Sequence, residues 1–207
     1  MTYLRCRLHH PMTRRSMVMT LLFAALFQAI ANADDIRFVV AVEAPLTASD
    51  GTLLGHLGLG TRVKVLAETQ DAFEVVVEGW SMEAGPSAVF FNDSQRILLI
   101  ALTEEGQSET EVLDTTTDSF ATVWNQVHVK GLLDAADLNQ DLSETWEAGD
   151  VLLQERCGGC HAVPRPDQYT ANQWPGTISS MVPSYAVLTD EELELLRKYV
   201  QFHASDM

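Results

Sequence analysis

A short cysteine–histidine motif near the C-terminal end is the feature of the sequence that most clearly indicates chemistry. Cys157, Cys160 and His161 form a C-x-x-C-H sequence, the pattern at which haem c is attached. Two thiols can add across the vinyl groups of a haem, and the imidazole that follows can bind the iron from the proximal side. Cys6 is the third cysteine of the chain and lies far from the motif. We therefore expect one haem c, bound covalently through Cys157 and Cys160.

Three other interpretations of the motif are weaker. A thioredoxin-like C-x-x-C needs a βαβ context, whereas Pro164 and Pro166 follow here. A structural zinc site needs a second pair of ligands, and no other cysteine pair is present. A disulfide between Cys157 and Cys160 would leave the role of His161 unexplained.

The second axial ligand of the iron is predicted to be Met181. It lies twenty residues beyond His161 and shares a predicted helical face with Trp174 and Ile178. Methionine ligation would raise the reduction potential relative to two histidines. His203 is the rival ligand, although a solvated or capping role suits it better. We therefore expect His161 and Met181 to be the metal ligands.

Helical segments must position these groups. Residues 141–144 resemble a capping box, and the helix that follows runs to Cys157. Thr189 and Glu192 form a second capping box. The apolar stripe of that last helix consists of Leu195, Leu196, Tyr199 and Phe202.

The segment from residue 36 to about 132 has the alternation of β-strands. Strands are predicted at 37–42, 61–66, 73–80, 96–102 and 123–129, and a faint repeat with an offset of 47 relates two strand–turn–strand units. Residues 104–119 are predicted to form exposed loops around one strand. The expected fold class is α+β, with a small all-β SH3-like barrel module at 34–135 followed by an all-α cytochrome c-like domain at 136–207.

Residues 1–33 have the features of a cleavable signal peptide. Arg14 and Arg15 precede a short apolar run at 17–27, and the A-x-A sequence 31–33 follows. The alternative is an uncleaved N-terminal anchor, and Met12 is a second candidate for the start. The expectation is export to the periplasm, with no stable membrane span after cleavage.

The charge excludes one large class of partner. Without residues 1–33 the chain has 9 basic and 29 acidic side chains, a net charge of −20. Nucleic acid is therefore not an expected partner, because phosphate recognition needs clustered Lys and Arg. A redox partner with a basic face is expected instead.

Residues 146–207 resemble the C-terminal monohaem domain of the pentahaem c-type cytochromes that feed periplasmic trimethylamine N-oxide reductase. The resemblance rests on the C-x-x-C-H motif, the segments 169–176 and 198–206, and Met181. Residues 127–131 resemble the β segment that precedes this domain in the same family. The tetrahaem domain of that family is not matched by any part of the sequence, which contains one C-x-x-C-H motif.

The resemblance implies a periplasmic carrier of single electrons rather than an enzyme. The donor would be an upstream cytochrome or a quinol-linked protein, and the acceptor a molybdenum-containing N-oxide or S-oxide reductase. The main alternative is a haem-bearing sensor or interaction module, and a peroxidase-like haem enzyme is the second. No Ser-His-Asp order, Walker loop or Rossmann fingerprint occurs.

Overall fold

A computed structural model describes residues 35–69, 71–159, 162–185 and 187–207. The predicted signal peptide, Cys160 and His161 lie outside these ranges. None of the helices in the described ranges is long and apolar enough to cross a membrane.

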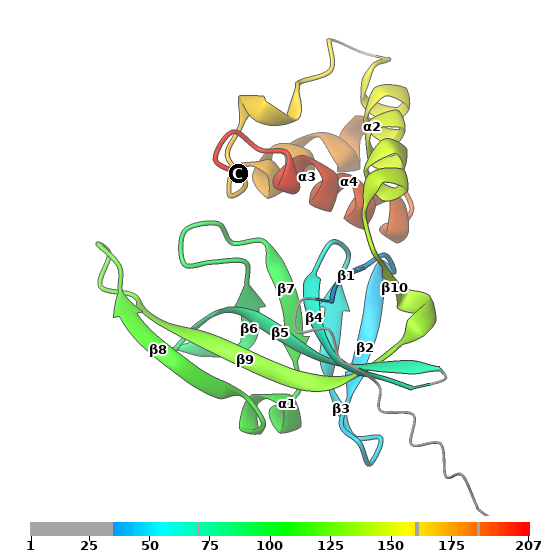
Figure 1. Ribbon diagram of the computed structural model, residues 1–207. Helices are drawn as coiled ribbons and strands as arrows, with labels where there is room; N and C mark the ends of the chain where they lie inside the picture. The colour runs from blue at the N-terminus through cyan, green and yellow to red at the C-terminus, as the bar shows by residue number, and fades with distance from the viewer. Residues whose placement is uncertain (1–34, 70, 160–161, 186) are drawn as a thin grey trace, which may run out of the picture.

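The N-terminal two thirds of the described residues form one antiparallel sheet with ten strands (Figure 1). Its strands are β1 (Ile36–Val39), β2 (Glu43–Thr47), β3 (Leu53–Gly58), β4 (Arg62–Glu68), β5 (Ala72–Met82), β6 (Gly85–Phe90), β7 (Leu98–Leu102), β8 (Glu111–Thr117), β9 (Val123–Asp134) and β10 (Leu138–Asn139). Their order across the sheet is β10-β1-β4-β5-β6-β7-β3-β2-β9-β8. The five predicted strands correspond to β1, β4, β5, β7 and β9.

Pairing between β5 and β9 closes part of this sheet into a ring. The two strands run antiparallel from Ala72↔Asp134 to Met82↔Trp124. The ring consists of β5, β6, β7, β3, β2 and β9, while β4 extends it on one side and β8 on the other. The two repeat units of the sequence are the hairpins β4–β5 and β8–β9, and their long strands are the ones that pair.

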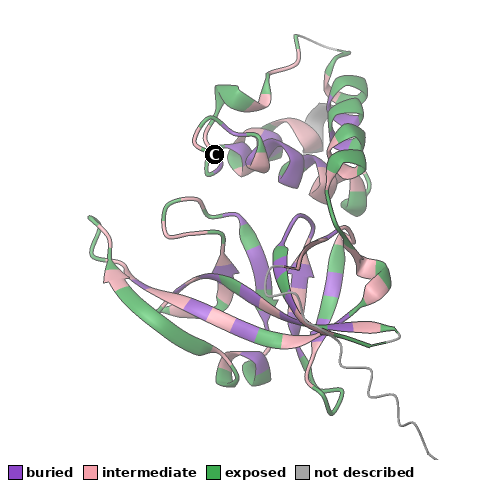
Figure 2. Ribbon diagram, viewed as in Figure 1, coloured by how far each residue is buried: buried purple, intermediate pink, exposed green. Residues whose placement is uncertain are grey.

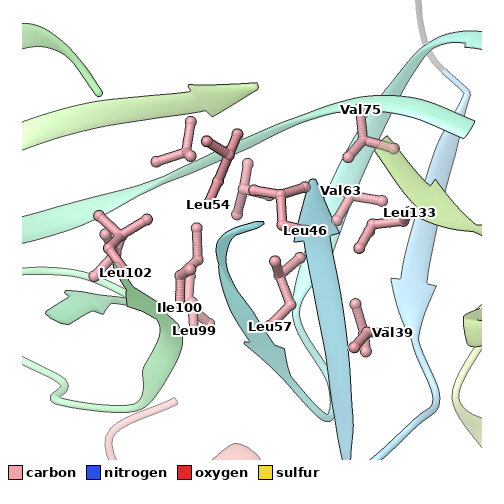
Figure 3. Close-up of a cluster of buried hydrophobic side chains, with 14 of the residues drawn as sticks. Val39, Leu46, Leu54, Leu57, Val63, Val75, Leu99, Ile100, Leu102 and Leu133 are labelled. Atoms are coloured by element: carbon pink, nitrogen blue, oxygen red, sulfur yellow. The ribbon is translucent and has the colours of Figure 1, made fainter. Parts of the chain in front are cut away.

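Alternating side chains fill the interior of the sheet (Figure 3). In β5, the even-numbered side chains from Glu74 to Trp80 face outward, and the odd-numbered positions are buried. Leu46, Leu57, Val63 and Ile100 are completely buried in the same apolar cluster. This core consists mainly of Val and Leu, which pack well on a pleated surface.

Most helices follow the sheet in the chain. The helices and 3₁₀ turns are α1 (Glu104–Ser108), η1 (Ala135–Asp137), η2 (Pro166–Gln168), α2 (Ser143–Cys157), α3 (Trp174–Tyr185) and α4 (Asp190–Phe202), of which α1 and η1 lie between strands. Figure 1 shows α2, α3 and α4 grouped on one side of the sheet, and Figure 2 shows buried residues interspersed with exposed ones along α2 and α4. α2 and α4 run antiparallel, since Arg156 pairs with Glu192 while Trp146 contacts His203.

The helices are tied to the sheet by both packing and hydrogen bonds. Phe202 packs against the apolar clusters of both parts, and Ile97 of the sheet region lies within the helical cluster. Gly60, with φ +81°, permits this approach: a Cβ there would lie 2.7 Å from the Phe202 ring. Asn172 accepts a hydrogen bond from the Arg96 amide at 2.7 Å.

The predicted fold class is therefore wrong. The described chain is mostly β-sheet, with ten antiparallel strands and a few short helices, and it contains no all-α cytochrome c-like domain after a small SH3-like barrel. The sheet is larger than expected because segments 43–58 and 85–90 add three strands, while segment 104–119 contains the one expected strand, β8, and also the helix α1. The helices enclose an apolar cluster of their own, which includes Ile97 of the sheet region and is joined to the sheet cluster through Phe202.

Local helix signals had mixed outcomes. The capping box at Thr189 is confirmed, because Thr189 accepts from the Glu192 amide and Glu192 accepts from the Thr189 amide. The one at 141–144 is wrong: α2 has Leu142 at its N-cap with no side-chain cap, and Asp141 accepts instead from the Ser143 amide at 2.9 Å. Both helices nevertheless begin within two residues of the predicted positions.

Candidate functional site

Cys157 is the last residue of α2 and is half-buried. Desolvation by burial raises the pKa of its thiol, which keeps the sulfur protonated at neutral pH. A protonated thiol is a poor nucleophile for exchange with disulfides. Cys160 and His161, the other two members of the motif, lie outside the described residues.

An apolar cluster surrounds this end of α2. Cys157 packs against it together with Val163 and Val182, and its buried members include Leu153 and Ile178. The surface beside the thiol is thus built from aliphatic side chains of α2 and α3. Such a surface suits the apolar face of a porphyrin, so the described residues fit a haem attached at Cys157.

Met181 lies on α3, which contributes to the same cluster. Trp174 and Ile178 are buried on the predicted face, as the spacing requires, whereas Met181 is half-buried. Its neighbour Val182 is the residue that packs against the cluster with Cys157. Cys157 on α2 and Met181 on α3 thus lie on helices that contribute to one apolar cluster, and both residues are half-buried.

His203 lies elsewhere. It follows the last turn of α4, where its Nδ1 donates to the Tyr199 carbonyl at 2.7 Å, and its ring contacts Trp146. Cys157 lies eleven positions after Trp146 in α2, which corresponds to about 16 Å along the helix. His203 is therefore placed at the opposite end of the α2–α4 pair from Cys157.

The remaining aromatic and histidine candidates have ordinary structural contacts. Trp174 is 1% exposed, and its Nε1 donates to the Pro166 carbonyl at 2.8 Å. His56 lies 3.6 Å from Glu43, and His128 lies 3.2 Å from Glu78, both on the sheet. Among the described residues, no group of three or more His, Cys, Asp or Glu side chains could hold a metal ion.

Lys198 is a feature that the sequence analysis missed. Its side chain is almost fully buried between α4 and the sheet, where Nζ donates to the Leu98 carbonyl. Burial, with a smaller contribution from Arg197, lowers its pKa to about 7. The sequence does contain one indication of this burial, because Lys198 lies between Leu195 and Phe202 on the apolar stripe of α4.

Comparison with known proteins identifies the sheet region. Residues 31–138 match the family described as the TorC third cytochrome c domain, which covers about half of the chain. This segment is the sheet together with a few residues on its N-terminal side, and it ends before α2. No solved structure matches the chain.

Two curated relatives match a larger share of the chain. The chain is 31% identical over 141 residues to the cytochrome c-type protein TorY of Haemophilus influenzae, which covers 66% of this chain and 37% of that protein. It is 28% identical over 155 residues to the cytochrome c-type protein TorY of Escherichia coli O157:H7, which covers 74% of this chain and 42% of that protein. The chain thus spans about two fifths of the length of these relatives. It belongs to the TorC third cytochrome c domain family.

Proposed function

We propose that this protein carries single electrons through one haem c. Cys157 and Cys160 would hold the porphyrin by thioether bonds, and His161 would be the proximal ligand of the iron. The proposal is supported above all by the position of Cys157, at the end of a helix and against an apolar cluster. Membership of a cytochrome c domain family and similarity to two cytochrome c-type proteins support it independently.

A bound haem c supplies reversible one-electron chemistry between the ferric and ferrous states. The role of the chain is to hold, shield and tune this group. Leu153, Ile178 and Val182 would form an apolar wall that keeps water from one part of the porphyrin. Met181 would saturate the iron as the distal ligand, which leaves no open position for a substrate and makes the protein a carrier rather than an enzyme.

His203 is the weaker candidate for the distal ligand. Its ring contacts Trp146, which lies about 16 Å from Cys157 along α2, at the other end of that helix. The hydrogen bond from its Nδ1 to Tyr199 instead fixes the ring at the other end of the helix pair.

We infer that the partners lie in the periplasm and meet the protein through charge. The predicted signal peptide would direct export, and the exported chain would carry a net charge of −20. An upstream cytochrome or quinol-linked protein would be the donor. The acceptor would be a molybdenum-containing N-oxide or S-oxide reductase with a basic face, and its turnover should fall as salt screens the attraction.

Haem staining of denaturing gels tests the attachment directly. The chain would be produced in a host that matures c-type cytochromes, alongside Cys157→Ala, Cys160→Ala and the double variant. Haem should remain with the wild-type polypeptide and be lost from the double variant. Ser179→Ala, an exposed change on α3, is the matched control and should stain like the wild type. A colourless wild-type protein with free thiols would refute the proposed function.

A further inference from the structure

A groove of 760 Å³ lies between the sheet and the helical segment, away from Cys157. Its floor is the outward face of β1, β4, β5 and β9, and its roof includes Trp146 of α2 and Phe202 of α4. The volume lies in the range of sites that enclose a cofactor-sized molecule. No step of the proposed electron transfer uses this groove.

The alternation of the strands places three cations on the floor. Val63 and Val65 point into the core, so Arg62 and Lys64 point outward into the groove. Lys130 reaches the same face from β9.

Cross-strand register fixes the spacing of the two lysines. Lys64 is opposite Val76 on β5, and Val76 is opposite Lys130 on β9. The two lysines therefore flank one valine, with their Cα atoms two strand spacings apart, or about 10 Å.

These cations have no acidic partner within the described part of the chain: none of the ion pairs found there includes Arg62, Lys64 or Lys130. Glu78 also lines the groove, but its carboxylate already accepts a hydrogen bond from Gln126 at 2.6 Å and lies 3.2 Å from His128. Three of the nine basic residues beyond residue 33 thus gather in one groove of a strongly acidic chain. This arrangement indicates an anionic ligand.

Aromatic side chains form the walls of the groove. Phe38 and Trp80 stand on the sheet, and Trp146 faces them from α2. The Trp146 ring is held by Phe202 at 5.6 Å and by His203 at 5.6 Å between ring centroids. Flat apolar walls favour a planar ring system, because stacking on aromatic side chains adds to the burial of apolar area.

We propose that this groove binds a planar aromatic molecule that carries two carboxylates. The separation of Lys64 from Lys130 matches two separate anionic groups better than one compact phosphate. Arg62, two residues from Lys64 on β4, can hold one carboxylate by two parallel hydrogen bonds. The ring system would lie between Trp80 and Trp146. This site is independent of the haem attached at Cys157.

Calorimetric titration with a porphyrin dicarboxylate tests the site. The full chain with its haem attached would be titrated with deuteroporphyrin IX and with its dimethyl ester, which has the same ring without the charges. We expect one molecule bound per chain, and at least tenfold weaker binding of the ester. Raising the salt concentration from 50 to 300 mM should also weaken binding of the dicarboxylate.

Charge variants distinguish the groove from nonspecific attraction. The double variant Lys64→Gln/Lys130→Gln should bind the dicarboxylate at least tenfold more weakly, and circular dichroism should show an unchanged fold because both side chains are exposed. Arg156→Gln/Arg165→Gln removes the same charge from exposed positions on the helical segment and should bind like the wild type. Absence of binding, equal binding of the two double variants, or equal binding of the ester would overturn the proposal.

Discussion

Lys198 allows a direct test of how closely α4 is packed against the sheet. Its side chain is 3% exposed, and its ammonium donates to the Leu98 carbonyl, with Glu194 at 3.7 Å. Burial lowers its pKa to about 7, from an ordinary value of 10.5, and the neighbouring Arg197 adds to this effect. The lysine is therefore largely neutral in the folded protein above pH 7.

The sign of the pH dependence follows from proton binding. Between about pH 7 and 10.5 the unfolded chain binds a proton at Lys198 that the folded chain does not, so the free energy of unfolding rises with pH. One such group contributes at most about 1.4 kcal/mol per pH unit. Lys198→Met keeps the length of the side chain and removes this contribution. Between pH 7.5 and 9.5 the free energy of unfolding should therefore rise by about 2 kcal/mol more in the wild type than in the variant.

Urea unfolding followed by circular dichroism at pH 7.5, 8.5 and 9.5 would measure this difference. Lys64→Met, a change to an exposed lysine of β4, is the matched control and should keep the pH slope of the wild type. If wild-type and Lys198→Met proteins have parallel curves, Lys198 is not desolvated by the sheet, and the described docking of α4 is refuted.

Three further changes test the helices and the distal ligand. Gly60→Ala should cost about 1–3 kcal/mol of unfolding free energy, because Gly60 has φ +81° and a Cβ would lie 2.7 Å from Phe202; wild-type stability would contradict that close approach. Thr189→Ala removes the acceptor of the Glu192 amide and should cost about 1 kcal/mol in urea unfolding, whereas Thr189→Ser should restore most of it. Met181→Ala should lower the reduction potential or open the distal position with haem still attached, as measured by redox titration and the ferric absorption spectrum; if neither changes, Met181 is not a ligand.

The elements that the sequence predicted correctly carry strong local signals. β4 and β9 have alternating side chains, and α4 begins at a capping box whose two hydrogen bonds both form. Local signals of this kind depend on residues within one or two turns of each other, so they can be read without knowledge of the fold.

The missed elements depend on distant partners. β3 contains Gly55 and Gly58, and β6 begins with Gly85 and Pro86, residues that are poor in strands by themselves. Pairing with β2, β5 and β7 stabilises them in spite of this composition. β8, the one strand expected within 104–119, is exposed over almost its whole length and pairs with β9.

The error in fold class and the burial of Lys198 have a common cause. The helical pattern beyond residue 142 indicates helices, but it does not indicate that Phe202 and Lys198 face a sheet. Phe202 approaches Gly60, and Lys198 donates to Leu98 of β7, so both contacts join residues that are far apart in the sequence. For the candidate site, the sequence predicted the helix that ends at Cys157, whereas the apolar cluster against which Cys157 packs depends on the three-dimensional structure.

The shared packing at Phe202 has a mechanical consequence. α4 contacts the sheet at Phe202 and Lys198, and α2 is joined to α4 by the Tyr199–Asp150 hydrogen bond, so the end of α2 is linked to the sheet through packed contacts. Any group bonded to Cys157 then has a fixed orientation with respect to the whole outer surface of the protein. The position at which a partner docks on the sheet would then fix the distance between the partner and that group. The rate of electron tunnelling would therefore depend on the docking position.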